Sequence, residues 1–134
     1  MSGYSKQGAR GLVLARAADA MLRSLGGGEI TLRLAGVNSQ PLAEFGIAQV
    51  AAAEVVLSPA VVRRSDGKGA TEVLVSATAV DAAVEAQQWA GADQMFQCIV
   101  GLVLNERAWK LESVATDTFS GVTYLYRMRL VERN

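Results

Sequence analysis

The segment from residue 123 to residue 132, TYLYRMRLVE, alternates between two kinds of side chain. Successive side chains of an extended strand point to opposite faces, so a period of two predicts a β-strand. One predicted face carries Tyr124, Tyr126, Met128 and Leu130, and the other carries Leu125, Arg127, Arg129 and Val131. The alternation therefore constrains this part of the chain to a sheet with one apolar, aromatic face and one face that bears two arginines.

Several earlier segments also read as strands. Strands are predicted at residues 29–35, 71–77, 101–104 and 108–114, turns at 65–69 and 105–107, and loops at 35–46 and 115–121. Residues 48–64 stay open between a helical turn and extended structure, because alanines there are followed by valines. Pro59 has no backbone N–H, so a strand through it would be interrupted, bulged or at a sheet edge.

Three helical segments are expected. Residues 6–25 have apolar side chains at helical spacing, and the glycines at 26–28 end that helix. Thr78 and Asp81 fit a capping box for a helix through about Trp89, which Gly91 ends. Asp93 is expected to cap a second short helix, whose apolar residues would be Met95, Phe96, Ile99 and Val100.

These elements predict an α+β fold in a single domain over residues 1–134. The β-rich core is expected at about 29–132, with an N-terminal helix at about 6–25 and a helical insertion at about 78–100. Strands joined by short turns pair antiparallel, and a small sheet must curl or be covered to bury one face. The expected architecture is a small curved antiparallel sheet or a partly open β-barrel.

The residue inventory excludes most catalytic chemistry. The chain has no histidine and one cysteine, Cys98, which removes His-dependent nucleophile systems, thiolate metal sites and an internal disulfide. The glycines at 26–28 follow a helix and lack a GK[ST] ending, so they are not a phosphate loop. A carboxylate pair is the remaining catalytic route, although Asp66, Asp81, Asp93 and Asp117 fit turn or capping positions. We therefore expect no enzyme, no cofactor and no metal site.

Charge narrows the choice of partners. Thirteen basic and thirteen acidic residues cancel, so the chain lacks the broad basic field that non-specific nucleic-acid binding requires. Only 19% of residues are charged, which indicates either buried subunit contacts or an alanine-rich composition. The N-terminal segment does not resemble a signal peptide, and no apolar run has the length of a membrane span. A cytoplasmic location is expected.

Five residues are candidates for a protein interface: Arg63, Arg64, Phe119, Arg127 and Arg129. Arg127 and Arg129 share one strand face and are spaced to meet two carboxylates or phosphates. For each arginine pair taken alone, a solvated outer face that deters edge-to-edge aggregation is the simpler explanation. Phe119 is expected to be exposed in the loop at 115–121.

Residues 54–64, 72–96 and 109–132 together resemble small bacteriophage or prophage neck proteins of the head-closure and head–tail connector class. The C-terminal hairpin of that class is matched here by Trp109, Leu111, Val114, Asp117, Gly121, Tyr124 and Tyr126. The resemblance implies a non-enzymatic subunit that assembles into a ring with portal or tail proteins, in the host cytoplasm or the virion. The alternatives are a cytosolic small-ligand or regulatory binding domain, and a carboxylate-dependent enzyme.

Overall fold

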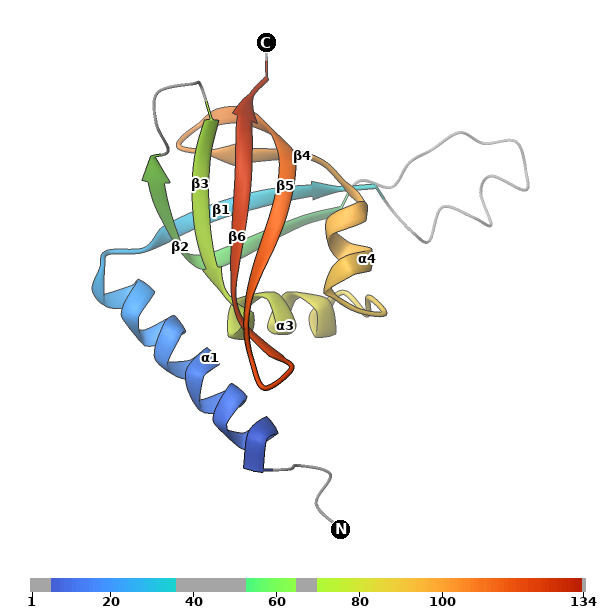
Figure 1. Ribbon diagram of the computed structural model, residues 1–134. Helices are drawn as coiled ribbons and strands as arrows, with labels where there is room; N and C mark the ends of the chain where they lie inside the picture. Colours follow the sequence, from blue (N-terminus) through green and yellow to red (C-terminus); the bar gives the residue numbers. More distant parts are fainter. Residues whose placement is uncertain (1–5, 36–52, 65–69, 134) are drawn as a thin grey trace, which may run out of the picture.

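The computed structural model describes residues 6–35, 53–64 and 70–133 and contains a closed antiparallel β-barrel (Figure 1). Its six strands are β1 (Gly28–Leu34), β2 (Ala53–Arg64), β3 (Ala70–Ser76), β4 (Ile99–Leu104), β5 (Arg107–Phe119) and β6 (Val122–Glu132). They follow one another around the barrel in the order β1-β2-β3-β6-β5-β4. The predicted α+β fold with a curved antiparallel sheet is confirmed, and the barrel is closed rather than partly open.

Large apolar side chains fill the barrel. The alternation predicted for β1 and β6 is confirmed, because Ile30, Leu32, Met128 and Leu130 have no exposed surface. Even an eight-stranded barrel is just wide enough for side chains to fill its interior, and a barrel of six strands is narrower still. Tyr126 is 8% exposed in the same cluster, so the tyrosine face of β6 is a wall of the core.

Strand β2 accommodates Pro59 at a bulge. Gly28 of β1 pairs with Ala60, but Ile30 pairs with Leu57, so β2 contains one extra residue in this interval. From Ala60 onward β2 also pairs with β3. The bulged alternative for residues 48–64 is therefore correct over Ala53–Arg64. Residues 48–52, the predicted turn at 65–69 and most of the predicted loop at 35–46 lie outside the described residues.

The hairpin of β5 and β6 is longer than predicted. Residues 115–121 were expected to form a loop, but Ala115 pairs with Arg127 and Phe119 pairs with Val122. Only Ser120 and Gly121 form the turn, both with positive φ, at 51° and 78°. The prediction is wrong because β-branched threonines find partners on β6, and pairing with a neighbouring strand overrides the turn-like composition. At the other end of β5, the predicted turn is confirmed at Asn105 and Glu106.

Helix α1 (Lys6–Ser24) packs on the outside of the barrel, against β3 and β6. Its buried Ala18 and Leu22 form a second apolar cluster with Leu125, which points outward from β6. The predicted glycine stop is confirmed: Gly26 has a φ of 77°, and the Gly27 amide donates to the Leu22 carbonyl at 3.0 Å. One apolar residue of β6 thus anchors the helix that the sequence predicted.

Helices α3 (Ala77–Ala86) and α4 (Ala92–Gln97) lie at one end and one side of the barrel (Figure 1). They bury Val80 and Met95 completely. The predicted helical insertion is present but shorter than expected, because Ile99 and Val100 belong to β4 rather than to the second helix. Helix α3 also ends at Ala86, ahead of the predicted Trp89.

Both predicted capping residues are wrong. The N-cap of α3 is Ser76, whose Oγ accepts a hydrogen bond from the Ala79 amide at 3.1 Å, and not Thr78. The N-cap of α4 is Gly91, while Asp93 lies within the first turn. The capping box failed because Ser76, at the end of β3, already occupies the position from which a side chain reaches the free amides.

Ser76 also ties α1 to the barrel. The side chain is fully buried, and its hydroxyl donates to Asp19 Oδ1 at 2.8 Å. Asp19 Oδ2 in turn accepts from Arg23 Nε at 2.9 Å. A single buried hydroxyl therefore connects the start of α3 with the middle of α1.

We expect Ser76→Ala to lower the free energy of unfolding by about 1–2 kcal/mol, because it removes an N-cap and the buried partner of Asp19. Urea denaturation followed by circular dichroism measures this change. Thr78→Ala is the matched control, since Thr78 is exposed and is not the cap, and it should change stability much less. Equal losses for the two variants would contradict the assignment of Ser76 as the cap.

Gly11 allows α1 to approach the hairpin closely. A Cβ atom at this position would overlap the side chain of Val122. Gly11→Ala should therefore destabilise the protein by about 1–3 kcal/mol, as overpacking does, in spite of alanine's better helix propensity. In the control Gly28→Ala the new Cβ meets no atom within 4 Å. Thermal denaturation distinguishes them, and a Gly11→Ala protein as stable as wild type would contradict the contact.

Candidate interaction surfaces

The outer face of the sheet carries a row of alternating charges across three strands. Arg63 of β2 pairs in register with Glu72 of β3, and Glu72 pairs with Arg129 of β6. Directly opposed residues of antiparallel strands lie on the same face of a sheet. The fold thus brings two of the candidate interface arginines into one row, with a glutamate between them.

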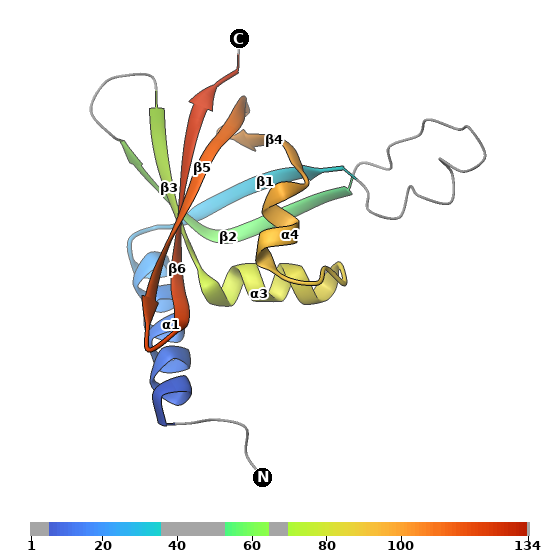
Figure 2. The ribbon, with the colours of Figure 1, turned by 45° about the vertical axis from the view of Figure 1, so that its right-hand side comes forward.

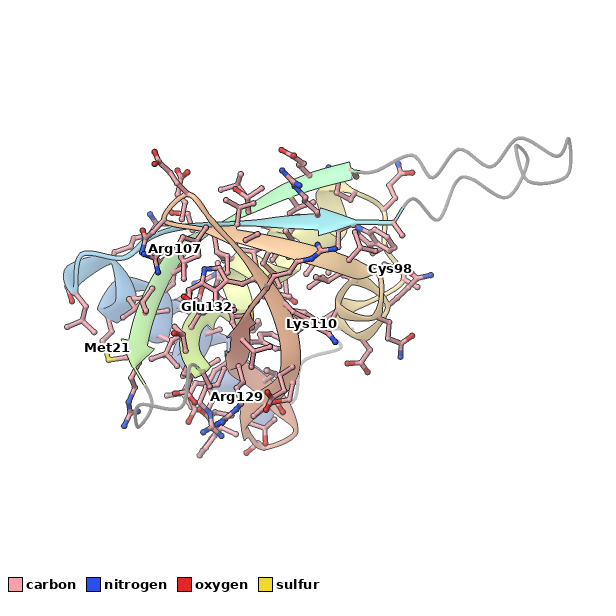
Figure 3. All side chains as sticks on the ribbon, turned by 90° about the horizontal axis from the view of Figure 1, so that it is seen from above. Met21, Cys98, Arg107, Lys110, Arg129 and Glu132 are labelled. Carbon is pink, nitrogen blue, oxygen red and sulfur yellow. The ribbon has the colours of Figure 1, made fainter. Side chains whose placement is uncertain are left out.

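The two arginines of β6 have carboxylate partners on β5. Arg127 Nη2 lies 3.2 Å from Asp117 Oδ1, and Arg129 Nε lies 2.9 Å from Glu112 Oε1. The register of β5 shifts between Leu111 and Ser113, at the position of Glu112. Figure 3 labels Arg129 on the outer side of the sheet. The spacing that suggested two carboxylates is therefore matched within the chain itself.

This pairing makes the arginine face charge-balanced. Exposed ion pairs typically contribute about 0.2–1 kcal/mol, and the paired arginine side chains remain 39% and 42% exposed. A balanced face differs from the continuous basic groove that a nucleic-acid backbone requires. It has instead the character of the polar rim of a protein interface.

The remaining candidates are distributed along the fold. Arg64 occupies the next position of β2, opposite Thr71, and its side chain lies outside the described part. Phe119 is 41% exposed at the end of β5. It lies four residues along β5 from Ala115, the partner of Arg127, which corresponds to roughly 13 Å in a strand. Asp117, the ion-pair partner of Arg127, lies only two residues from Phe119 on β5, so Arg127 and Phe119 occupy neighbouring parts of the hairpin.

Tyr126 of the barrel lies close to Phe96, Asp81 and Asp93 of the helical insertion, a grouping that the sequence did not predict. The rings of Tyr126 and Phe96 are 5.3 Å apart. Burial raises the pKa of the Tyr126 hydroxyl, the negative charges of Asp81 and Asp93 raise it further, and a hydrogen bond with Thr123 lowers it. The hydroxyl thus stays protonated at neutral pH and does not serve as a base. Asp81 and Asp93 had been assigned to caps because their proximity to Tyr126 arises only in the folded chain.

Partial desolvation raises the pKa of the Asp81 carboxyl, although the residue as a whole remains exposed to solvent. A carboxyl with a raised folded pKa favours its protonated form in the native state, so native stability falls as the pH rises from the unfolded pKa through the folded pKa. Asp81→Asn should therefore stabilise the protein at pH 7 and have a smaller effect at pH 3. Thermal denaturation at the two pH values tests this, and an advantage only at pH 3 would contradict it.

A pocket of about 320 Å³ opens near the end of α1. It lies where β1 and β2 separate beyond the pair Gly28 and Ala60. Leu25, Glu29, Val62, Leu104 and Asn105 are among the residues that line it. Because these residues come from several distant segments, no local sequence pattern could have indicated the pocket.

Helix α1 keeps apolar side chains on its outer side. Leu12, Val13 and Met21 are 42–62% exposed, although the opposite side of the helix is buried against the barrel. Figure 3 labels Met21 at the periphery of the molecule. Val56 and Val100 are other exposed apolar residues, at 51% and 58%. These exposed apolar side chains lie on α1, β2 and β4.

Comparisons with protein-family models, curated proteins and solved structures found no match to this chain. Among the described helices, none combines the length and apolarity needed to cross a membrane. Within residues 6–35, 53–64 and 70–133, no three His, Cys, Asp or Glu side chains gather closely enough to hold a metal ion. The candidate sites therefore rest on the geometry of the chain itself.

Proposed function

We propose that this protein is a non-enzymatic structural subunit of a phage or prophage particle, a head–tail connector or head-closure protein that acts by assembling into a ring. The observation that carries the proposal is the distribution of apolar side chains. The barrel has a filled core and is covered by α1 on one side, yet apolar residues remain exposed on α1 and at the tip of the β5–β6 hairpin.

The filled interior supports a function on the outer surface. The largest inward side chains, such as Leu57, Leu102 and Met128, are at most 1% exposed and pack against one another across the barrel. A subunit of a ring needs two different surfaces, one for each neighbour, because a head-to-tail contact joins unlike patches. Phe119 at the hairpin tip and Met21 toward the other end of α1 are both exposed and lie on different parts of the surface.

The charge-balanced face supports a protein partner. Arg127 and Arg129 keep their ion pairs with Asp117 and Glu112 while remaining partly exposed. Such a face can exchange or extend its ion pairs with a portal or tail protein without leaving an unpaired charge buried. It offers no excess positive charge for nucleic acid.

Co-purification tests the function directly. The chain is co-expressed with a tagged portal protein from the same genome, and the complex is isolated at physiological salt. We expect a stable complex that contains several copies of this chain per portal ring. A portal protein that retains none of the chain, with the tail proteins of that genome also negative, would contradict the proposal.

Phe119→Ser and the double change Arg127→Gln with Arg129→Gln should each weaken assembly without unfolding the monomer. These residues are partly exposed in the monomer, so replacing them costs little core packing. In the proposed assembly the same residues are buried between subunits, so replacing them removes contacts there. Sedimentation of the portal complex and circular dichroism measure the two effects. Val56→Ser, which also removes an exposed apolar side chain from a strand, is the control, and unchanged assembly in both test variants would remove these residues from the interface.

A further inference from the structure

Strand β5 has one edge that no other strand covers along most of its length. Its pairing with β4 ends at Trp109, and beyond this residue the described part of the chain pairs β5 with β6 alone. Figure 2 shows this part of β5 running beside β6 and α1, away from β4. No residue of β5 after Trp109 is buried, as expected of a strand that lacks a second neighbour. The barrel thus closes through the first residues of β5 and leaves an open edge along the rest.

The regular part of this edge runs from Ser113 to Phe119. The register between β5 and β6 shifts twice. At the first shift Glu112 is the extra residue and forms a bulge on β5, whereas at the second shift the extra residue is Tyr124 of β6. Between the first bulge and the hairpin turn, β5 is therefore an uninterrupted strand.

Alternate backbone groups of this segment point away from β6. Ser120 and Gly121 both have positive φ and form a two-residue turn, and the residues that close such a turn, here Phe119 and Val122, are hydrogen-bonded to each other. Bonded and non-bonded positions then alternate along an antiparallel strand. No backbone hydrogen bond joins the outward groups to another element of the described chain. The outward-facing positions are Val114, Thr116 and Thr118.

The segment lacks the usual protection of an exposed edge. Native proteins protect edges with lysine, proline or a bulge. From Ser113 to Phe119 the sequence SVATDTF has no lysine or proline, and its one charged residue, Asp117, is held by Arg127 of β6 at 3.2 Å. Valine and threonine also favour extended structure. The unpaired donors and acceptors therefore form a template for one more strand.

The side chains beside this edge indicate which strand fits. Leu111 and Val114 are half-buried and pack against the core. The outer face carries the carboxylates of Glu112 and Asp117, whose side chains are 48% and 31% exposed. A second copy of the same edge would bring two more carboxylates, and like charges on neighbouring strands are destabilising. A strand with one apolar and one basic face fits instead, and β6 already meets β5 with this pattern.

We propose that the edge of β5 from Ser113 to Phe119 binds an extended segment of a partner protein as an additional strand. The segment alternates apolar side chains, which cover Leu111 and Val114, with arginine or lysine side chains, which meet the carboxylate of Asp117. The inference goes beyond the proposed function, because strand addition is a property of the isolated chain and holds whichever protein supplies the segment.

A synthetic peptide with the sequence of β6, VTYLYRMRLVE, is the probe, labelled with fluorescein and titrated with the protein. The variant Thr116→Pro removes one outward N–H and leaves the hydrogen bonds between β5 and β6 in place, since proline is tolerated where the N–H of an edge strand faces solvent. The matched control is Thr116→Val, which keeps this N–H. A scrambled peptide of the same composition controls for binding that depends on charge alone.

We expect saturable binding by the wild-type chain and by Thr116→Val, and binding weaker by about tenfold or more for Thr116→Pro, because a ladder hydrogen bond is lost and the proline ring obstructs the added strand. Circular dichroism verifies that both variants are folded. Equal affinity of the two variants, equal binding of the scrambled peptide, or no binding to the wild-type chain up to about 1 mM peptide would overturn the proposal.

Amide hydrogen exchange measured by NMR locates the bound strand without any substitution. In the free chain, the amides of Val114, Thr116 and Thr118 should exchange much faster than those of the residues between them, which bond to β6. Bound peptide should protect the fast amides. Protection already present in the free chain, or absent at saturation, would overturn strand addition. The portal co-purification decides the proposed function separately, so that function stands or falls independently of this result.

Discussion

Met128 and Leu130 of β6 are fully buried inside the barrel, while Leu125, on the opposite face of the same strand, packs beneath α1. β6 pairs with β3 on one side and β5 on the other, so both layers depend on its register. A shift by one residue would place the arginines in the core and expose the apolar residues that fill it. The cost of burying those charges fixes the register.

The register of β6 also places the surfaces proposed for assembly. With Leu125 fixed against Leu22, the hairpin continues alongside α1 until Val122 meets Gly11. Phe119 is thereby placed beside one half of the helix, and the pocket at the helix end is formed where α1 turns into β1. A core interaction thus determines where Phe119, one of the residues proposed for assembly, lies on the surface.

Much of this architecture follows from local patterns in the sequence. The period of two in β1 and β6, the helical spacing in α1 and the glycines after it each act over a few residues, and each predicted its element correctly. Barrel closure was not predictable in this way, because it depends on β4 pairing with β1 across more than sixty residues. The predicted cap at Thr78 is wrong because Ser76, at the end of β3, already accepts the Ala79 amide. The predicted loop at 115–121 is wrong because pairing with β6 overrides its turn-like composition.

The candidate site was predictable only in part. Arg127 and Arg129 were correctly placed on one outer face by alternation alone, but their partners Asp117 and Glu112 depended on the extended hairpin and on the register shift in β5. The group formed by Tyr126 and Asp81 and the pocket at Val62 combine separate elements. Both the tyrosine–aspartate group and the pocket form only when these separate elements come together in the folded chain, so no local sequence pattern predicts them.

Electron cryo-microscopy of the chain assembled with its portal protein tests the account most directly. The predicted result is a closed ring in which each subunit contacts its two neighbours through unlike surfaces, with Phe119, Arg127 and Arg129 buried at the contacts. Subunits joined by two-fold axes through identical surfaces, or bound singly without touching one another, would contradict it.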